Sequence, residues 1–204
     1  MNRIALMVLK NTFALPGLWT KLCAHAKNPD NYPEIDRWNH IQKIMKAALK
    51  AGNVDLVVTG KENTPDKDGL LLVANHQGLF DVVALVTAWD KILCAVYKIE
   101  LKDVPLVKQI AASTKSYAMD REDVRQSLTV IQGCTEQLKN NRNVLIFPEG
   151  TRSKNGNVMG NLSLHFCFLQ SDRNSFGLEA RLQIGDLHLT KMEDRCGKSR
   201  IYAW

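Results

Sequence analysis

The chain has 204 residues, of which 45% are hydrophobic and 24% charged, and its formal net charge is +6. This length and composition predict one globular domain with a sizeable core, and they exclude a protein that crosses a membrane several times. Residues 1–50 hold eight basic and three acidic residues, so +5 of the charge lies at the N-terminus beside apolar side chains. We expect an anionic membrane surface as the partner of this segment, and we expect no nucleic acid because no nucleic-acid-binding motif accompanies it.

The five cysteines are scattered along the chain without C-x-x-C spacing. Such a pattern argues against both a zinc site and a disulfide framework, and it favours a reducing, cytoplasmic setting.

The N-terminal region is predicted to form amphipathic helices that associate with a membrane. Its longest early uncharged run, 11–20, is far shorter than the roughly 20 residues that a membrane-spanning helix needs. The clearest helix is 34–50, with an apolar stripe at three- and four-residue spacing and its lysines away from that stripe. Two interpretations stay open: the stripe covers the protein core, or the helix lies on anionic lipid.

An alternation of strands and helices follows. The predicted strands are 54–59, 70–74, 92–97, 117–119 and 144–147, and the predicted helices are 81–89, 104–112 and 122–139. On the last helix, Val124, Leu128, Ile131 and Leu138 are predicted to share one face. Residues 180–190 have the composition of a strand or a hairpin. The pattern indicates the α/β class: a single domain with a mostly parallel, mixed sheet flanked by helices.

Three polar turns follow three of the predicted strands. They are Asn75-His76 with Asp81 five residues after the histidine, the segment 117–121, and the segment 147–153. Loops at the carboxyl ends of parallel strands meet at one edge of the sheet, so these turns are predicted to share a cleft.

His76 and Asp81 are the candidate catalytic pair. A histidine at a strand end is more often structural, and a metal site would need a third ligand at suitable spacing, which the sequence lacks. No G-x-S-x-G motif occurs, so a serine nucleophile has little support. The remaining chemistry is a histidine base, oriented by a carboxylate, that deprotonates a hydroxyl group of the substrate.

Arg121 and Arg152 indicate what that substrate carries. The guanidinium group offers a planar fork of donors that suits phosphate oxygens. Gly150 permits close approach of the backbone, and the hydroxyl of Thr151 adds a donor. The alternative for each arginine is a local salt bridge, with Asp120 or Glu149 as the partner.

These motifs resemble those of the glycerophospholipid acyltransferase family. The resemblance is carried by Asn75-His76-Gln77-x-x-x-Asp81 together with Phe147-Pro148-Glu149-Gly150-Thr151-Arg152-Ser153. Val57-Val58-Thr59-Gly60-Lys61-Glu62-Asn63 resembles the family's first strand and its following turn, and Tyr117-Ala118-Met119-Asp120-Arg121 resembles its second motif. The likeness covers roughly 1–160 and is greatest to bacterial lysophosphatidate (1-acylglycerol-3-phosphate) acyltransferases.

The resemblance implies a role for each candidate residue. His76 would be the general base on the free hydroxyl of lysophosphatidate, and Asp81 would orient it and stabilise the imidazolium. The glycerol phosphate would be bound by Arg121, Glu149, Gly150, Thr151 and Arg152. The hydroxyl would attack the thioester of acyl-CoA or acyl-acyl carrier protein directly, giving phosphatidate without a metal or a cofactor.

The implied location is the cytoplasmic face of the cell membrane, as a peripheral or monotopic protein. Two alternatives stay open. One is an acyltransferase for another lysolipid or for glycerol phosphate, and the other is a non-catalytic family member.

The sequence departs from the family pattern mainly after Gly160. Gly78 stands where the family commonly has Ser, and Ser116 stands where it has Gly. Beyond 160, the family's Phe-Lys-x-Gly segment and later Pro-Val or Pro-Ile motif do not occur. We therefore divide the chain into an N-terminal amphipathic segment (1–50), an acyltransferase core (51–160) and an atypical tail (161–204).

We interpret the tail as the product of a frameshift or an altered gene end. Translating the coding DNA in its other two frames is expected to reveal both missing motifs. A translation that lacks them in both frames would contradict this interpretation.

Overall fold

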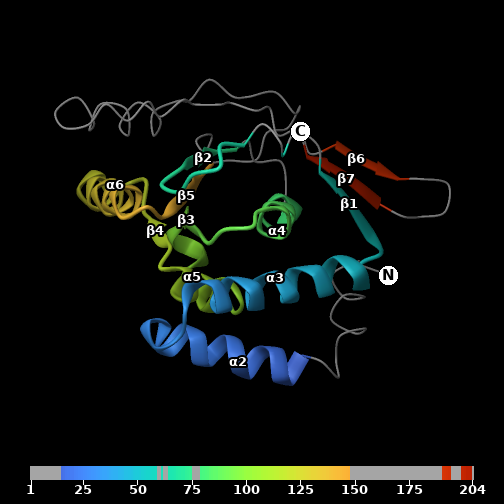
Figure 1. The fold of residues 1–204 in the computed structure, drawn as a ribbon. Coiled ribbons are helices and arrows are strands. Elements are labelled where there is room, and N and C mark those ends of the chain that lie inside the picture. The colour runs from blue at the N-terminus through green and yellow to red at the C-terminus, as the bar shows by residue number, and fades with distance from the viewer. Residues whose placement is uncertain are drawn as a thin grey trace.

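The centre of the protein is a four-stranded parallel sheet with helices on both faces (Figure 1). The structure is a computed structural model, and it describes residues 15–58, 61, 64–74, 79–147, 190–193 and 199–203. The strands are β1 (Val54–Val58), β2 (Leu71–Val73), β3 (Leu93–Lys98), β4 (Tyr117–Met119), β5 (Asn143–Ile146), β6 (Thr190–Glu193) and β7 (Ser199–Ala203). The helices are α2 (Leu15–Lys27), α3 (Glu34–Ala51), α4 (Leu79–Ala88), α5 (Val107–Thr114) and α6 (Val124–Lys139), with short 3-10 turns η1 (Pro29–Asn31) and η3 (Ile99–Leu101).

The strand order of the central sheet is β2-β5-β3-β4, and all its pairs are parallel. The chain moves from β2 to β3 to β4 in one direction and then returns to β5. Because crossovers between parallel strands are right-handed, a reversal of direction requires the connecting helix to change faces. The packing agrees: Leu93 and Leu145 join a core cluster with α2, α3 and α4, whereas Cys94 and Val144 join a cluster with α6. This arrangement confirms the predicted α/β single domain.

Helix α3 covers the core with its apolar stripe. Trp38 and Ile41 are 1% and 0% exposed, and Met45 and Leu49 are also buried, whereas Ile35, the first residue of the predicted stripe, is 53% exposed. The indole N–H of Trp38 donates to the backbone carbonyl of Trp89 at 3.0 Å. Trp89 is the residue directly after α4. Of the two interpretations of this helix, the structure supports the one in which the stripe packs inward. Any contact of α3 with lipid would therefore use its exposed lysines and Ile35 at its start.

No helix in the described part of the chain combines the length and the hydrophobicity needed to cross a bilayer. In α2, Leu22 is fully buried in the core cluster, while Trp19 is 39% exposed. This helix packs mainly against α5 and α3. The N-terminal helices that are described are thus part of the packed domain.

Helix α6 is rotated relative to the face that the sequence predicts. Ile131 is buried and Leu138 partly buried as expected, but Val124 is 70% exposed and Leu128 50% exposed. The physical reason is Gly133, where an added Cβ would lie 2.8 Å from the ring of Tyr117 on β4. Without a side chain at this position, the helix packs directly against that ring.

Strand β1 lies outside the central sheet. It pairs in parallel with β7, and β7 pairs antiparallel with β6, which gives a three-stranded sheet at the right of Figure 1. The predicted strand or hairpin at 180–190 lies outside the described residues apart from Thr190, where β6 begins. The sequence predicted β1 itself correctly, but its pattern of side chains does not specify this partner.

Candidate active site

Two of the polar turns begin side by side at one edge of the central sheet. Strands β2 and β5 pair with Val73 opposite Ile146, and the N–H of Ala74 donates to the carbonyl of Ile146 at 3.1 Å. The turn that contains His76 follows Ala74 directly in the sequence, and the Pro-Glu-Gly-Thr-Arg turn follows Phe147. Two motifs some seventy residues apart therefore leave the sheet next to each other.

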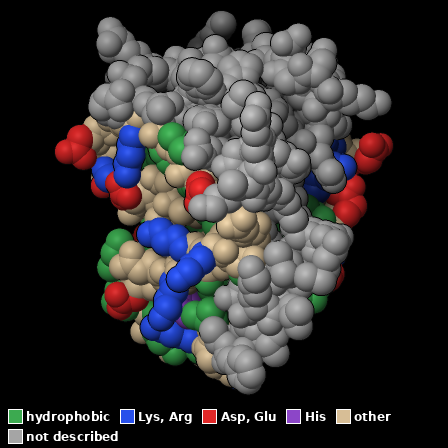
Figure 2. Space-filling view, turned by 90° about the vertical axis from the view of Figure 1, so that its right-hand side faces the viewer, with side chains coloured by type: hydrophobic (Ala, Val, Ile, Leu, Met, Phe, Trp, Pro, Cys, Tyr) green, Lys and Arg blue, Asp and Glu red, His purple; other side chains and the backbone are tan. Residues whose placement is uncertain are grey.

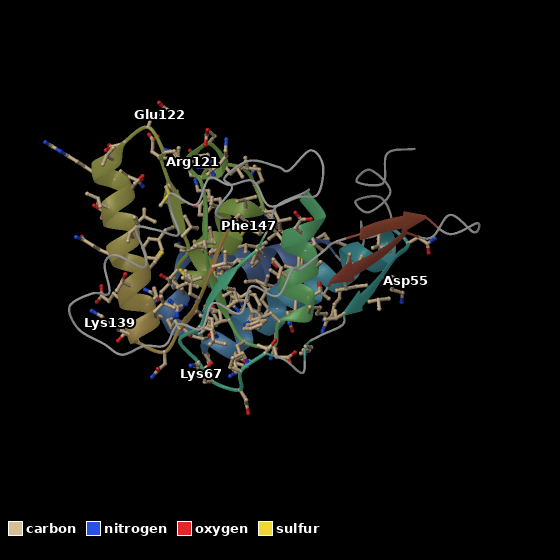
Figure 3. The ribbon with its side chains drawn as sticks, turned by 90° about the horizontal axis from the view of Figure 1, so that it is seen from above. Asp55, Lys67, Arg121, Glu122, Lys139 and Phe147 are labelled. Atoms are coloured by element: carbon tan, nitrogen blue, oxygen red, sulfur yellow. The ribbon has the colours of Figure 1, made fainter. Side chains whose placement is uncertain are left out.

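The third turn leaves the same edge two strands away. Strand β3 separates β5 from β4, and neighbouring strands are about 4.8 Å apart, so β4 runs about 10 Å from β5. Figure 3 shows Arg121 and Phe147 toward one end of the strands, while Lys67 and Lys139 lie at the other end. All three predicted turns thus begin at the edge formed by the carboxyl ends of the strands.

The position of β2 against β5 is fixed at their amino ends by a buried amide. The side-chain oxygen of Asn143, which is 1% exposed, accepts the N–H of Leu70 at 3.0 Å. In return, the N–H of Val144 donates to the carbonyl of Leu70 at 2.9 Å. Just before, Gly69 has a φ of +73°, and a Cβ there would approach the carbonyl of Leu138 to 3.0 Å. This contact network sets which residue of each strand reaches the carboxyl edge.

Asp81 is the member of the predicted catalytic pair that the structure describes. It lies in the first turn of α4 and is 4% exposed. A carboxylate in the first turn of a helix is stabilised by the positive end of the helix dipole. Asp81 is therefore held inside the domain, five residues after the predicted base and at the start of the helix that follows its turn.

Arg121 is exposed, and its positive charge acts on Glu100, which lies in η3 directly after β3. The pKa of the Glu100 carboxyl is lowered first by a hydrogen bond from its own backbone, then by Lys98, and also by Arg121. The Lys98 ammonium lies 3.7 Å from a Glu100 carboxylate oxygen. The carboxylate of Asp120, a suggested partner of Arg121, accepts the N–H of Glu122 at 3.0 Å.

Lys98, the last residue of β3, and Glu100, in the 3-10 turn η3 that follows, form a fourth polar group that the sequence did not lead us to predict. The signal was present, because Lys98 directly follows the predicted strand 92–97 and Glu100 comes two residues later. Their relevance follows from the strand order, which places β3 between β5 and β4 at the candidate site.

The other predicted site residues, His76, Glu149, Gly150, Thr151 and Arg152, lie outside the described residues. The structure describes the strands that lead to them and not the side chains themselves. Their proposed roles stay predictions.

The fold and this edge define an α/β protein whose candidate site is built from loops at the carboxyl ends of parallel strands. A family model described as Acyltransferase matches residues 55–169, which is more than half of the chain. The chain therefore belongs to the acyltransferase family.

Individual relatives agree with this assignment. A 1-acyl-sn-glycerol-3-phosphate acyltransferase of Helicobacter pylori is 36% identical over 45% of this chain and 38% of its own length. The enzyme of the same name from Saccharomyces cerevisiae is 30% identical over 56% of this chain and 36% of its own length. The crystal structure of the 1-acyl-sn-glycerophosphate acyltransferase PlsC from Thermotoga maritima matches with a TM-score of 0.50 at 30% identity, covering 64% of this chain and 53% of that one. The chain thus matches little more than a third of the length of these two curated relatives.

Replacing Asn143 by alanine is expected to destabilise the protein. The substitution leaves the N–H of Leu70 without its acceptor at a part-buried position, which costs about 1–3 kcal/mol of unfolding free energy. Urea unfolding followed by circular dichroism measures the change. Asn39→Ala, at an exposed position of α3, serves as the control and is expected to shift the free energy by no more than about 0.5 kcal/mol. Equal stabilities of the two variants would contradict the role of Asn143.

Proposed function

We propose that this protein transfers a fatty acyl group from an acyl thioester to the free hydroxyl of lysophosphatidate, giving phosphatidate. The observation that carries the proposal is the parallel pairing of β2 with β5, which starts the histidine turn beside the Pro-Glu-Gly-Thr-Arg turn. A base and a phosphate-binding loop must be adjacent for this reaction, because the hydroxyl and the phosphate belong to one small glycerol unit. The names of the relatives support the same substrate.

In this mechanism His76 takes the proton of the acceptor hydroxyl as the oxygen attacks the thioester carbonyl. Asp81 orients the imidazole and stabilises its cationic form, a role that suits a carboxylate kept inside the domain at 4% exposure. The thiolate of the donor leaves, and the proton held by His76 neutralises it. No acyl-enzyme is needed, and we propose neither a metal nor a cofactor.

The glycerol phosphate of the acceptor would be bound by Arg121 on one side and by Glu149, Gly150, Thr151 and Arg152 on the other. The position of Arg121 two strands from β5 suits a ligand that spans about 10 Å between the two turns. Lys98 adds a further cation to the Arg121 side. Glu100 partly balances this charge, with a carboxylate oxygen 3.7 Å from the Lys98 ammonium.

The donor is acyl-CoA or acyl-acyl carrier protein, and we propose an anionic membrane as the surface from which the acceptor is drawn. The protein would be peripheral or monotopic on the cytoplasmic face. Its net charge of +6 and the exposed Lys43, Lys46 and Lys50 of α3 support an attraction to anionic lipid. Figure 2 shows lysine and arginine side chains gathered on the face where α3 ends.

His76→Ala is expected to lower the rate of acyl transfer by about 10²–10⁴, because a positioned base contributes that much. The measurement is transfer of labelled acyl groups from acyl-CoA to lysophosphatidate by the purified chain, with circular dichroism to show that the variant is folded. His188→Ala, outside the motif, is the control and is expected to retain the parent rate. Near-parent turnover by His76→Ala would refute the proposed mechanism.

The same assay with a panel of lysolipids and glycerol phosphate distinguishes the alternative acceptors. No turnover by the folded parent would identify a non-catalytic protein.

Arg121→Ala is expected to raise the KM for lysophosphatidate at least about tenfold, since a charge-assisted contact with phosphate is lost. Its matched control is Arg125→Ala, an equally exposed arginine in the first turn of α6. Steady-state kinetics with varied acceptor concentration measure both. A KM that changes equally in the two variants would show that Arg121 contributes only general positive charge.

A further inference from the structure

We propose that residues 99–107, the docking loop, insert into the surface of an anionic bilayer and place the candidate active site against it. This inference rests on the proposed function, because it concerns how the site reaches a lipid acceptor. The loop connects β3 to α5, so it starts at the carboxyl end of β3, the edge that carries the predicted turns. Its apolar side chains Leu101, Val104 and Leu106 are 41%, 40% and 37% exposed.

The docking loop has a defined backbone in spite of this exposure. Successive turns are closed by hydrogen bonds from Lys102 N–H to Ile99 at 3.0 Å, from Val104 N–H to Leu101 at 3.1 Å, and from Lys108 N–H to Val104 at 2.9 Å. Because the backbone is already ordered, little conformational entropy is lost when its side chains enter lipid.

Leu106 gives a second reason to assign a function to this loop. Its φ of +74° lies in a region that leucine rarely adopts, and its N–H donates to the side-chain oxygen of Gln109 at 2.8 Å. Glycine would relieve this strain and would expose no apolar surface. Strained backbone is found preferentially at functional sites, and here it presents a leucine to the outside.

The charges around the docking loop select an anionic bilayer as the partner. Lys98, Lys102 and Lys108 alternate with its apolar residues, and Glu100 and Asp103 neutralise two of them, at 3.7 Å from Lys98 and 3.1 Å from Lys108. Apolar side chains flanked by lysines are the composition of segments that lie at the boundary of headgroups and acyl chains. Arg121 follows β4, the strand beside β3, and adds positive charge at the same edge of the sheet.

Helix α3, which carries exposed lysines, is anchored at the other end of the sheet. Glu34, at the start of α3, lies 3.0 Å from Arg142, which immediately precedes β5, and Gln42 donates to the carbonyls of Val86 and Trp89 at the end of α4. A bilayer bound through those lysines alone would not meet the carboxyl edge. The candidate site lies at that edge, and insertion of the docking loop brings the lipid surface to it.

Sedimentation with vesicles of equal parts phosphatidylglycerol and phosphatidylcholine tests the inference without any need for activity. Leu101→Ser combined with Leu106→Gly is expected to lower the partition coefficient at least about tenfold, since two partly inserted leucines are lost. The matched control is Ile35→Ser, which removes a more exposed apolar side chain, 53% exposed, at the start of α3. It is expected to bind within about twofold of the parent chain. Thermal unfolding establishes that both variants are folded.

A second measurement places the loop in the bilayer directly. Brominated lipid is expected to quench the tryptophan fluorescence of Val104→Trp more strongly than that of the parent. The tryptophan fluorescence of Ile35→Trp is expected to be quenched no more than that of the parent. Parent-like partitioning of the double variant, equal losses in the control, or no vesicle binding by the parent would overturn the inference. So would a changed oligomeric state of the double variant with unchanged partitioning, because the loop would then be an interface between copies.

Activity separates this inference from the proposed function. With a short-chain lysophosphatidate present as a soluble monomer, the double variant is expected to match the parent rate, and with acceptor embedded in vesicles it is expected to be slower. A parent without activity on either acceptor contradicts the proposed function and leaves the vesicle result to decide about the docking loop.

Discussion

The parallel pairing of β2 with β5 is the constraint on which the candidate site depends. Side chains alternate between the faces of a sheet, so a shift of one residue in this pairing would move every side chain of β2 to the other face and displace the turn that follows. The buried Asn143 fixes the register by binding the backbone of Leu70 at the start of β2. The geometry of the carboxyl edge is thus set by a contact at the amino edge.

The amino edge is also where the N-terminal helices are fastened to the sheet. Arg37, 2% exposed, donates to the carbonyls of Tyr32 and Ser113, and Glu34 bridges it to Arg142. These contacts join α3 to the end of α5 and the start of β5. A buried arginine is tolerated because its donors are satisfied by carbonyls and a carboxylate. The fixed architecture lies at this edge, and the charged turns proposed for function lie at the opposite one.

Positive charge occurs at two places, and we assign a different role to each. The lysines of α3 can attract an anionic surface at long range, whereas Lys98 and Arg121 lie at the carboxyl edge, at the end of β3 and just after β4. The exposed leucines of the docking loop supply the short-range apolar contact that charge cannot give. Long-range attraction would use the lysines of α3 and insertion the leucines of the docking loop, while Lys98 and Arg121 would serve both the contact with the bilayer and the binding of the acceptor.

The sequence by itself determined the α/β class, the positions of most helices and strands, and the motifs that mark an acyltransferase, because hydrophobic periodicity and local motifs are properties of short segments. It did not determine that α6 turns Val124 and Leu128 outward, since that depends on Gly133 meeting the ring of Tyr117 from another strand. Nor did it place β1 beside β7 or bring Lys98 and Glu100 to Arg121. Strand order and face-to-face packing join residues far apart in the chain, and only the tertiary structure decided them.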